Sequence, residues 1–247
     1  MYTAPPNPPR WRYSVLVYVV WALDYSQMEL RIAASMSRDP EMLRLLNAGV
    51  NMHDALVEQV KRMTGRTVPY VAAKRINFGV QYQGKVPAMK RSLARERVLL
   101  DDDAIQEMLD AHESMYPTYH AWSRAEGEAA VARGYAETLW GRRYYDPLLV
   151  SSDPTAQQEA MRSAVAVAIS GTGADIVKGL MVDCVPVLRE YDASLIVQVH
   201  DEIVGYVGAE HGEAFTEALT TLAESYELPG VRLVANMSLA ANWALAH

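Results

Sequence analysis

The chain has 247 residues, of which 50% are hydrophobic and 21% are charged, with 14 glycines and 12 prolines. These proportions are typical of one or two ordinary globular domains, and they exclude disordered, collagen-like and low-complexity chains. One cysteine, Cys184, allows neither a disulfide framework nor a cysteine zinc cluster, so a reducing compartment, the cytoplasm, is the expected location.

Charge is unevenly distributed along the sequence. The net charge is −7, but residues 61–100 contain ten basic residues and one acidic residue, Glu96, and therefore carry a net charge of +9. The other 207 residues hold 13 basic and 29 acidic residues, a net charge of −16. Such a basic segment is either a solvated helical surface or a surface that binds phosphate groups.

The first predicted element is a strand over about 13–24. The prolines of residues 3–10 make the preceding segment a loop or arm. The apolar run YSVLVYVVWAL is too short to cross a bilayer, so no membrane partner is expected, and its valines and tyrosines favour a strand buried on both faces. Asp24 ends this run, and a helix is expected to begin near Ser26.

A largely helical stretch is predicted from there to about residue 145. Within it, Thr67 and Pro69 indicate a helix start and Gly84 a helix end. Four residues spaced four apart share one face of this helix: Tyr70, Lys74, Phe78 and Tyr82. A cation between aromatic rings can bind a phosphate while a ring supports a base or sugar. The alternative is an aromatic core stripe along which the lysine extends to solvent.

The last part of the chain is predicted to form a long helix, a β-hairpin, a helix and a strand. Their ranges are about 155–191, 195–207, 210–226 and 231–239. The hairpin turn is formed by His200 and Asp201. This order of elements predicts an α+β fold, in which an antiparallel sheet has helices on one face and a mainly helical insertion.

Two aspartates follow apolar strands and are expected at one sheet end, Asp24 after the first strand and Asp201 at the hairpin turn. Carboxylates placed side by side repel each other unless a cation neutralises them, so a divalent-metal site is physically sensible. All-oxygen ligation suits Mg²⁺ better than Zn²⁺. The alternative is that Asp24 caps the next helix and Asp201 is a turn residue. A phosphate contact is also open to Arg162, whose alternative is an exposed surface arginine.

Taken in order, six segments resemble the successive motifs of family A DNA polymerases, the DNA polymerase I type. They are DYSQMELRIAA (24–34), AAKRINFGVQY (72–82), GYAETLWGRRYY (134–145), SGTGADIVK (170–178), QVHDEIV (198–204) and NWALAH (242–247). The resemblance extends from about Val15 to the C-terminus. It is specific because several independent motifs occur in the family's order and approximate spacing.

The resemblance implies a palm, formed by residues 1–35 with the N-terminal arm and by residues 151–247, and an inserted fingers subdomain over 36–150. Thumb and exonuclease domains are absent from the chain in this reading, and a second chain that supplies one of them is a candidate partner. A fragment of a larger gene is the alternative. The other implied partners are primer-template DNA and deoxynucleoside triphosphates. The implied location is the cytoplasm, or the host cytoplasm for a phage-encoded chain.

The resemblance also implies two Mg²⁺ ions, for which Mn²⁺ can substitute, held by Asp24, Asp201 and the carbonyl of Tyr25. One ion would lower the pKa of the primer 3′-hydroxyl and the other would carry the triphosphate. Lys74 would act with the two aspartates in catalysis, because it binds phosphate and can protonate the leaving group. The implied nucleotide contacts are Gln27, Glu29, His53, Lys74, Phe78 and Tyr82. Glu29 would exclude a ribose 2′-hydroxyl. The implied DNA contacts are Arg162, His200 and Glu202, with Glu202 beside the metals.

Four positions depart from the family's pattern. Tyr70 stands where the family has a triphosphate-binding arginine, and Arg66 and Arg75 are candidates to replace it. Gln83 stands where the family has a glycine. Ala166 and Ser170 stand where an amide pair reads the minor groove, which predicts a looser check on base-pair geometry.

The leading hypothesis is therefore a nucleotidyltransferase, a DNA-templated DNA polymerase that acts in replication or repair by two-metal transfer of deoxynucleotides. The alternative is a non-catalytic DNA-binding or replisome subunit that retains the palm fold. A metal phosphohydrolase built on His200 and Asp201 is weaker, because the other histidines have no recognisable ligand spacing.

Overall fold

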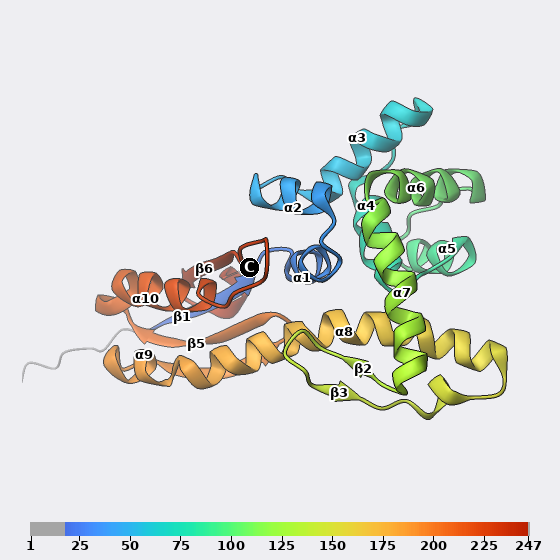
Figure 1. Cartoon of the computed structure of the whole chain (residues 1–247). Coiled ribbons are helices and arrows are strands. Elements are labelled where there is room, and N and C mark those ends of the chain that lie inside the picture. The colour runs from blue at the N-terminus through green and yellow to red at the C-terminus, as the bar shows by residue number, and fades with distance from the viewer. Residues whose placement is uncertain (1–17, 247) are drawn as a thin grey trace, which may run out of the picture.

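In the computed structural model, which describes residues 18–246, four antiparallel strands form the main sheet in the order β4-β5-β1-β6 (Figure 1). The strands are β1 (Tyr18–Tyr25), β4 (Ser194–Val199), β5 (Glu202–Gly208) and β6 (Ala235–Ala240). The predicted arm and the first residues of the predicted strand, 3–17, lie outside the described residues. The hairpin of β4 and β5 has the predicted two-residue turn.

The two faces of the sheet have different surroundings. Trp21 and Leu23 of β1 belong to the main hydrophobic core, and the Trp21 ring lies 5.4 Å from the ring of Phe215 in the helix that follows β5. Val20 and Ala22 point to the opposite face, where they form a small cluster with Val204, because successive side chains of a strand alternate between faces. The main helices packed on the sheet therefore cover one face, as predicted.

A helical insertion separates β1 from β4. Its helices are α1 (Met28–Ser37), α2 (Pro40–Asn47), α3 (Met52–Thr64), α4 (Tyr70–Gln81), α5 (Val86–Arg95), α6 (Asp102–Met115) and α7 (Pro117–Arg133). They are followed by the two-stranded sheet β2 (Ala136–Glu137) and β3 (Arg143–Tyr144) and by η1 (Pro147–Val150). The predicted α+β class, antiparallel sheet and helical insertion are confirmed. The palm and fingers boundaries stay predictions, since one hydrophobic core continues through both regions.

The remaining elements complete the sheet region. They are α8 (Pro154–Asp183), α9 (Val185–Glu190), η2 (Ala209–His211), α10 (Gly212–Glu224) and η3 (Trp243–Leu245). The predicted single helix over 155–191 is two helices, because Pro186 has no N–H for the helical ladder and stands in the first turn of α9. The predicted final strand begins later, at Ala235.

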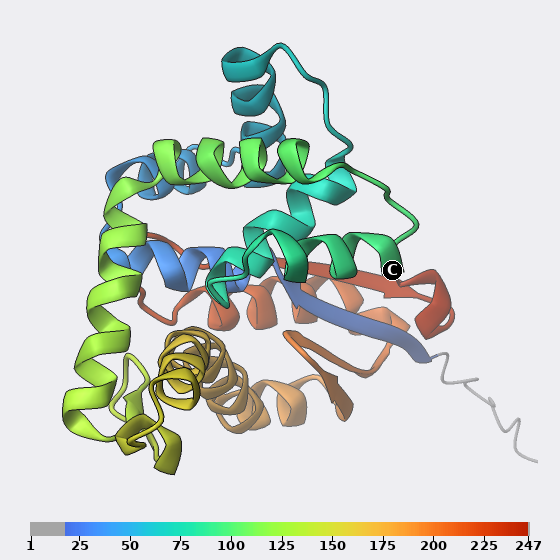
Figure 2. The same ribbon diagram turned by 90° about the vertical axis from the view of Figure 1, so that its right-hand side faces the viewer.

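Helix α8 connects the two regions. It contacts α7, β2 and η1 in the insertion, α1 between them, and α10 and β5 in the sheet region, and Figure 2 views it nearly end-on, beside the lower end of α7. Residues 154–190 are long and apolar enough to cross a membrane, but half of the most apolar window is buried inside the protein. These contacts identify α8 as a core helix of this fold.

One buried carboxylate connects the start of the insertion to its last long helix. Asp39, which is 0% exposed, accepts hydrogen bonds through Oδ1 from the backbone amides of Glu41 and Met42, both at 3.0 Å. Its Oδ2 accepts a hydrogen bond from the amide of Tyr119 at 3.1 Å. The same side chain therefore caps α2 and satisfies an amide in the first turn of α7.

Candidate active site

The predicted carboxylates lie at one end of the main sheet. The Cα of Asp24 is paired with Glu202 of β5 and with Asn236 of β6. Asp201 directly precedes Glu202, in the turn between β4 and β5. Asp24 is exposed and belongs to β1, whereas the residue at the N-cap of α1 is Gln27. The interpretation of Asp24 as a helix cap is therefore wrong, and Asp201 is a turn residue placed beside it.

Glu29 extends this acidic end of the sheet. It lies in the first turn of α1 and is half-buried. Burial raises the pKa of Glu29, the negative charge of Asp201 raises it further, and the charge of His200 opposes this change. Asp201 and Glu29 therefore repel each other, and a bound cation would relieve that repulsion.

The candidate ligands for a divalent ion are oxygens. They are the carboxylates of Asp24 and Asp201 and the backbone carbonyl of Tyr25, which ends β1. Within residues 18–246, no three His, Cys, Asp or Glu side chains are grouped so that they could hold a metal ion. A divalent ion would therefore complete its ligand shell with water and substrate phosphate oxygens, the coordination that Mg²⁺ prefers. The donor set fits Mg²⁺.

The predicted aromatic and cationic face of α4 is directed away from the core. Tyr70 and Tyr82 are 43% and 54% exposed, Lys74 is exposed and Phe78 is half-buried. The alternative interpretation as an aromatic core stripe is wrong, because the buried residues of this helix, such as Ile76, lie on its other side. The exposed face can contact a ligand.

His53 lies against this face. It is 4% exposed, and its ring centroid lies 5.6 Å from those of Tyr70 and Phe78. The Nδ2 of Asn77 donates a hydrogen bond to its Nδ1 at 2.9 Å, so Nε2 carries the proton. Burial and then the charge of Lys74 lower the pKa of His53 to about 4. The imidazole is therefore neutral at neutral pH and has an N–H donor left on Nε2.

Two asparagines and Gln27 support this cluster. Sequence reasoning missed Asn77, which lies on the buried side of α4, and Asn51, whose Oδ1 caps α3 while its Nδ2 donates to the Tyr70 hydroxyl at 3.1 Å. The position of Asn51 directly before a helical pattern is a cap signal that could have identified it. Gln27 accepts a hydrogen bond from the amide of Met52 through Oε1 at 3.1 Å.

The end of α4 lies close to the carboxylates. Burial and the negative charge of Glu29 raise the pKa of the Tyr82 hydroxyl. Glu29 is thus an electrostatic neighbour of both Asp201 and Tyr82. The structure thereby brings together residues from β1, α1, α4 and the β4–β5 turn that are far apart in the sequence.

The predicted DNA contacts occupy different places. Arg162 of α8 lines a cavity of about 560 Å³ together with Tyr82 and Arg91. His200 is exposed in the hairpin turn with a positive φ of 55°, and Glu202 is 6% exposed. Of the two departures on α8, one is the buried Ala166 and the other is Ser170, whose hydroxyl donates to the Ala166 carbonyl at 2.7 Å.

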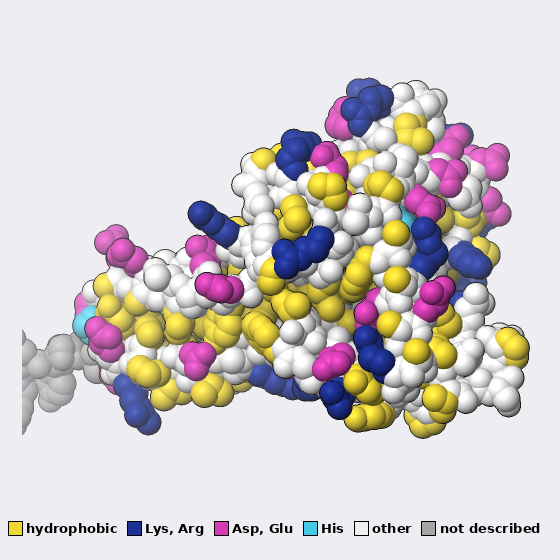
Figure 3. Space-filling view, viewed as in Figure 1, with side chains coloured by type: hydrophobic (Ala, Val, Ile, Leu, Met, Phe, Trp, Pro, Cys, Tyr) yellow, Lys and Arg dark blue, Asp and Glu magenta, His cyan; other side chains and the backbone are white. Residues whose placement is uncertain are grey.

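Acidic neighbours partly neutralise the basic segment 61–100. Arg66 pairs with Asp101 at 3.5 Å and with Glu107 at 2.9 Å, and Arg75 pairs with Glu96. Acidic side chains gather over α6 at the upper right of the space-filling view, beside basic ones (Figure 3). The two arginines considered as replacements at the Tyr70 position are thus engaged in ion pairs. The count of +9 overstates the charge that a phosphate backbone would meet.

Comparisons with known proteins identify the family of this chain. The sequence matches DNA polymerase family A over residues 14–245. It is 31% identical over 232 residues to the thermostable DNA polymerase I of Thermus aquaticus, covering 93% of this chain and 27% of that protein. It is 32% identical over 235 residues to DNA polymerase I of Pseudomonas aeruginosa, covering 93% of this chain and 25% of the relative. This chain therefore spans about a quarter of the length of these curated relatives.

A solved structure shows the same fold. The POL domain of Pol1 from M. smegmatis, in complex with a DNA primer-template and dNTP, superposes with a TM-score of 0.82 at 23% identity. The match covers 92% of this chain and 40% of that chain. Because the family match extends over nearly the whole chain and the fold agrees with it, the protein belongs to DNA polymerase family A.

Proposed function

We propose that this chain catalyses the DNA-templated transfer of deoxynucleotides to a primer 3′-hydroxyl. The observation that carries the proposal is the position of Glu29, which interacts electrostatically with both Asp201 and Tyr82. In this proposal, a carboxylate pair suited to Mg²⁺ and the exposed aromatic and cationic face of α4 border one space. Such a space suits a nucleoside triphosphate, because carboxylates hold metal-bound phosphates and rings support a base.

Mg²⁺ would be held by the carboxylates of Asp24 and Asp201 and by the carbonyl of Tyr25. When bound, the ions lower the pKa of the attacking hydroxyl and neutralise charge on the triphosphate. The membership in DNA polymerase family A supports this assignment.

Three side chains supply donors toward the phosphates. The ammonium of Lys74 binds phosphate oxygens and gives a proton to the leaving pyrophosphate. The neutral His53 donates through Nε2, because its Nδ1 already accepts from Asn77. Gln27 donates through its amide nitrogen, because its Oε1 already accepts from Met52. Fixed partners on the inner side of His53 and Gln27 orient both groups before the nucleotide binds.

The base and sugar are bound by the other residues of the cluster. The rings of Phe78 and Tyr82 support the incoming base and the sugar. Glu29 lies beside them and excludes a ribose 2′-hydroxyl. Arg162 and His200 contact the primer and template backbone, with Glu202 beside Asp24. Primer-template DNA and dNTP are ligands named for the structural relative. A partner chain with a thumb or exonuclease stays a prediction.

Primer extension tests the proposal. The purified chain is incubated with primer-template, Mg²⁺ and four deoxynucleotides at low salt, beside Asp24→Asn, Asp201→Asn and the control Asp103→Asn, an exposed aspartate of α6. We expect the first two variants to lose more than about 100-fold in rate, since each removes a charged metal ligand. The control should extend like the wild type.

Two outcomes would contradict the proposal. Extension that survives both substitutions would refute the metal assignment. DNA binding by the folded wild type without incorporation at any enzyme concentration would identify the alternative, a non-catalytic DNA-binding or replisome subunit. That alternative draws on the absence of amide side chains at Ala166 and Ser170.

A further inference from the structure

Helix α4 ends in a turn that normally contains glycine. Tyr82 is its C-cap, and the next residue, Gln83, has a φ of 47°. The amide of Gln83 donates to the carbonyl of Val80 at 2.8 Å, and the amide of Gly84 donates to the carbonyl of Gly79 at 3.0 Å. This pair of hydrogen bonds defines a Schellman motif, whose left-handed position is usually a glycine. Here that position is occupied by a glutamine.

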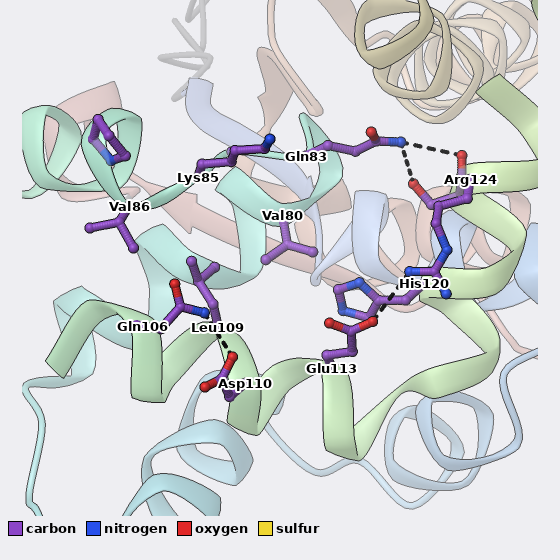
Figure 4. Close-up of a pocket in the computed structure, with 13 residues that line it drawn as sticks. Val80, Gln83, Lys85, Val86, Gln106, Leu109, Asp110, Glu113, His120 and Arg124 are labelled. Carbon is purple, nitrogen blue, oxygen red and sulfur yellow. Dashed lines mark hydrogen bonds and ion pairs between the residues drawn. The ribbon is translucent and has the colours of Figure 1, made fainter. Parts of the chain in front are cut away.

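The side chain of Gln83 connects this turn to α7. Its Nε2 donates to the Oγ of Ser123 at 3.0 Å and to the Ser123 carbonyl at 3.3 Å, as Figure 4 shows by the dashed lines from Gln83. Ser123 is 3% exposed within α7. A glycine at position 83 would adopt the positive φ more easily, but it could not reach α7.

The turn has open space on two sides. One cavity of about 560 Å³ separates it from α6 and α7 (Figure 4). A second cavity of about 560 Å³ extends from the turn to Arg162 of α8 and is lined by Tyr82. Residues Gln83, Gly84, Lys85 and Pro87 line both cavities. The turn is therefore bordered by a cleft on each side, and the Gln83–Ser123 contact lies beside the first of them.

We propose that Gln83 is a positioning residue for nucleotide binding: its hydrogen bonds to Ser123 hold the α4–α5 turn, and with it Tyr82, in place beside the cavity that Tyr82 lines together with Arg162 of α8. This inference rests on the proposed function, because Tyr82 is the residue through which Gln83 acts. The tether restricts the turn in the free protein, so that less freedom is lost when the nucleotide binds.

The variants distinguish the effect of the Gln83–Ser123 hydrogen bonds, the tether, from the effect of the backbone conformation at position 83. Gln83→Met keeps a side chain of similar length and the same demand on φ but removes both donated hydrogen bonds. Ser123→Ala removes one acceptor and leaves the carbonyl. The control is Gln106→Met, the same substitution on the α6 wall of the first cavity, where the side chain bonds Asp110 rather than the turn.

Two measurements are made on each variant. The first is the Kd of the complementary dNTP for the Mg²⁺ complex with a primer-template whose primer ends in a dideoxynucleotide, which requires no turnover. The second is hydrogen exchange of residues 79–88, where the amides of Gln83 and Gly84 report on the turn directly. Thermal melting accompanies both measurements.

We expect Gln83→Met to raise the nucleotide Kd about fivefold, the factor that corresponds to one typical net hydrogen bond. Exchange in 79–88 should become faster, and Gln106→Met should match the wild type in both measurements. Ser123→Ala should have a smaller effect and none beyond Gln83→Met when the two are combined, because they remove the same contact.

Other results would overturn the inference or the proposed function separately. Faster exchange or a lower Tm with an unchanged Kd would show a structural tether that does not position the nucleotide site. Unchanged exchange would show that no tether exists. A wild type that neither extends primers nor binds dNTP would refute the proposed function, and the positioning role would fail with it. Faster exchange in Gln83→Met alone would then still identify the tether.

Discussion

Glu29 is a carboxylate kept in a place that disfavours its charge. Burial and the neighbouring Asp201 both raise its pKa, so the folded protein holds the Glu29 proton more tightly than the unfolded chain does. The sign follows from linkage: stability associated with this group is complete below its ordinary pKa and is lost as the pH rises through the folded pKa. The site therefore retains Glu29 at the expense of stability at neutral pH.

Replacing this carboxylate with an amide should stabilise the protein in a pH-dependent way. At about pH 7.5, Glu29→Gln should have a higher Tm than the wild type, because the amide brings no charge next to Asp201. The difference should shrink as the pH falls through the raised pKa of Glu29 and vanish below its ordinary pKa of 4.5. Thermal melts across this range measure it, with the exposed Glu128→Gln of α7 as the control. A difference independent of pH would contradict the explanation.

The same residue should determine sugar choice. Glu29→Ala should raise incorporation of ribonucleotides relative to deoxynucleotides, because a smaller side chain beside Tyr82 leaves space for a 2′-hydroxyl. The measurement is the ratio of kcat/KM for matched ribonucleotide and deoxynucleotide, with Glu128→Ala as the control. If the ratio does not change, Glu29 is not the residue that excludes the hydroxyl.

Among the helices, α2 and α7 are connected by the side chain of Asp39. Asp39→Ala should lower the free energy of unfolding by about 2–4 kcal/mol, because it removes a helix cap and leaves the buried amide of Tyr119 without its acceptor. Asp39→Asn should lose less, since one oxygen can still cap α2. The control is Asp153→Ala, which removes the exposed cap of one helix, α8. This variant should lower the free energy of unfolding by about 1 kcal/mol. Equal losses in the free energy of unfolding for Asp39→Ala and Asp153→Ala in denaturant melts would contradict this explanation.

Local sequence patterns predict where helices and strands lie better than they predict the contacts between these elements. The β4–β5 hairpin follows from two apolar runs around His200 and Asp201, and Gly84 predicts the end of α4 close to its observed position. The left-handed residue there is Gln83, and its conformation is supported by Ser123, 40 residues away. The role of Asp39 is equally hidden, because the amide of Tyr119 lies 80 residues further along the chain. Helix propensity and periodicity carry no information about such partners.

For the whole molecule, the distribution of charge matters more than its total. Arg91 lines the cavity that also contains Arg162 and Tyr82. If the phosphate backbone of bound DNA lies along this cavity, Arg91→Ala should change the salt dependence of binding. The magnitude of the slope of the log of the DNA-binding constant against log salt should fall by about 0.9 for duplex DNA. DNA-binding titrations between about 50 and 200 mM salt measure the slope. The control Arg44→Ala removes an exposed arginine paired with Glu41 on α2. Equal slopes for Arg91→Ala and the wild type would exclude Arg91 from the DNA surface.

At this scale the sequence predicts less. The position of β1 between β5 and β6 cannot be read from periodicity, because the pairing of the strands depends on long-range packing. The meeting of Glu29 with Tyr82 likewise depends on how the insertion packs on the sheet region. The net charge of residues 61–100 follows directly from the sequence. The acidic partners of Arg66 in that segment, Asp101 and Glu107, lie just outside it and were not counted.

Helix α8 also restricts where residues can be inserted into or deleted from the chain. It is one helix of 30 residues, about 45 Å long at 1.5 Å per residue, and Gly173 near its centre lies against Met28 and Ile32 of α1. One inserted residue there would rotate everything beyond it by about 100° and shift it by about 1.5 Å, so that Arg162 and the sheet could not both keep their places. Insertions and deletions are therefore expected in loops such as 96–101, and not within α8.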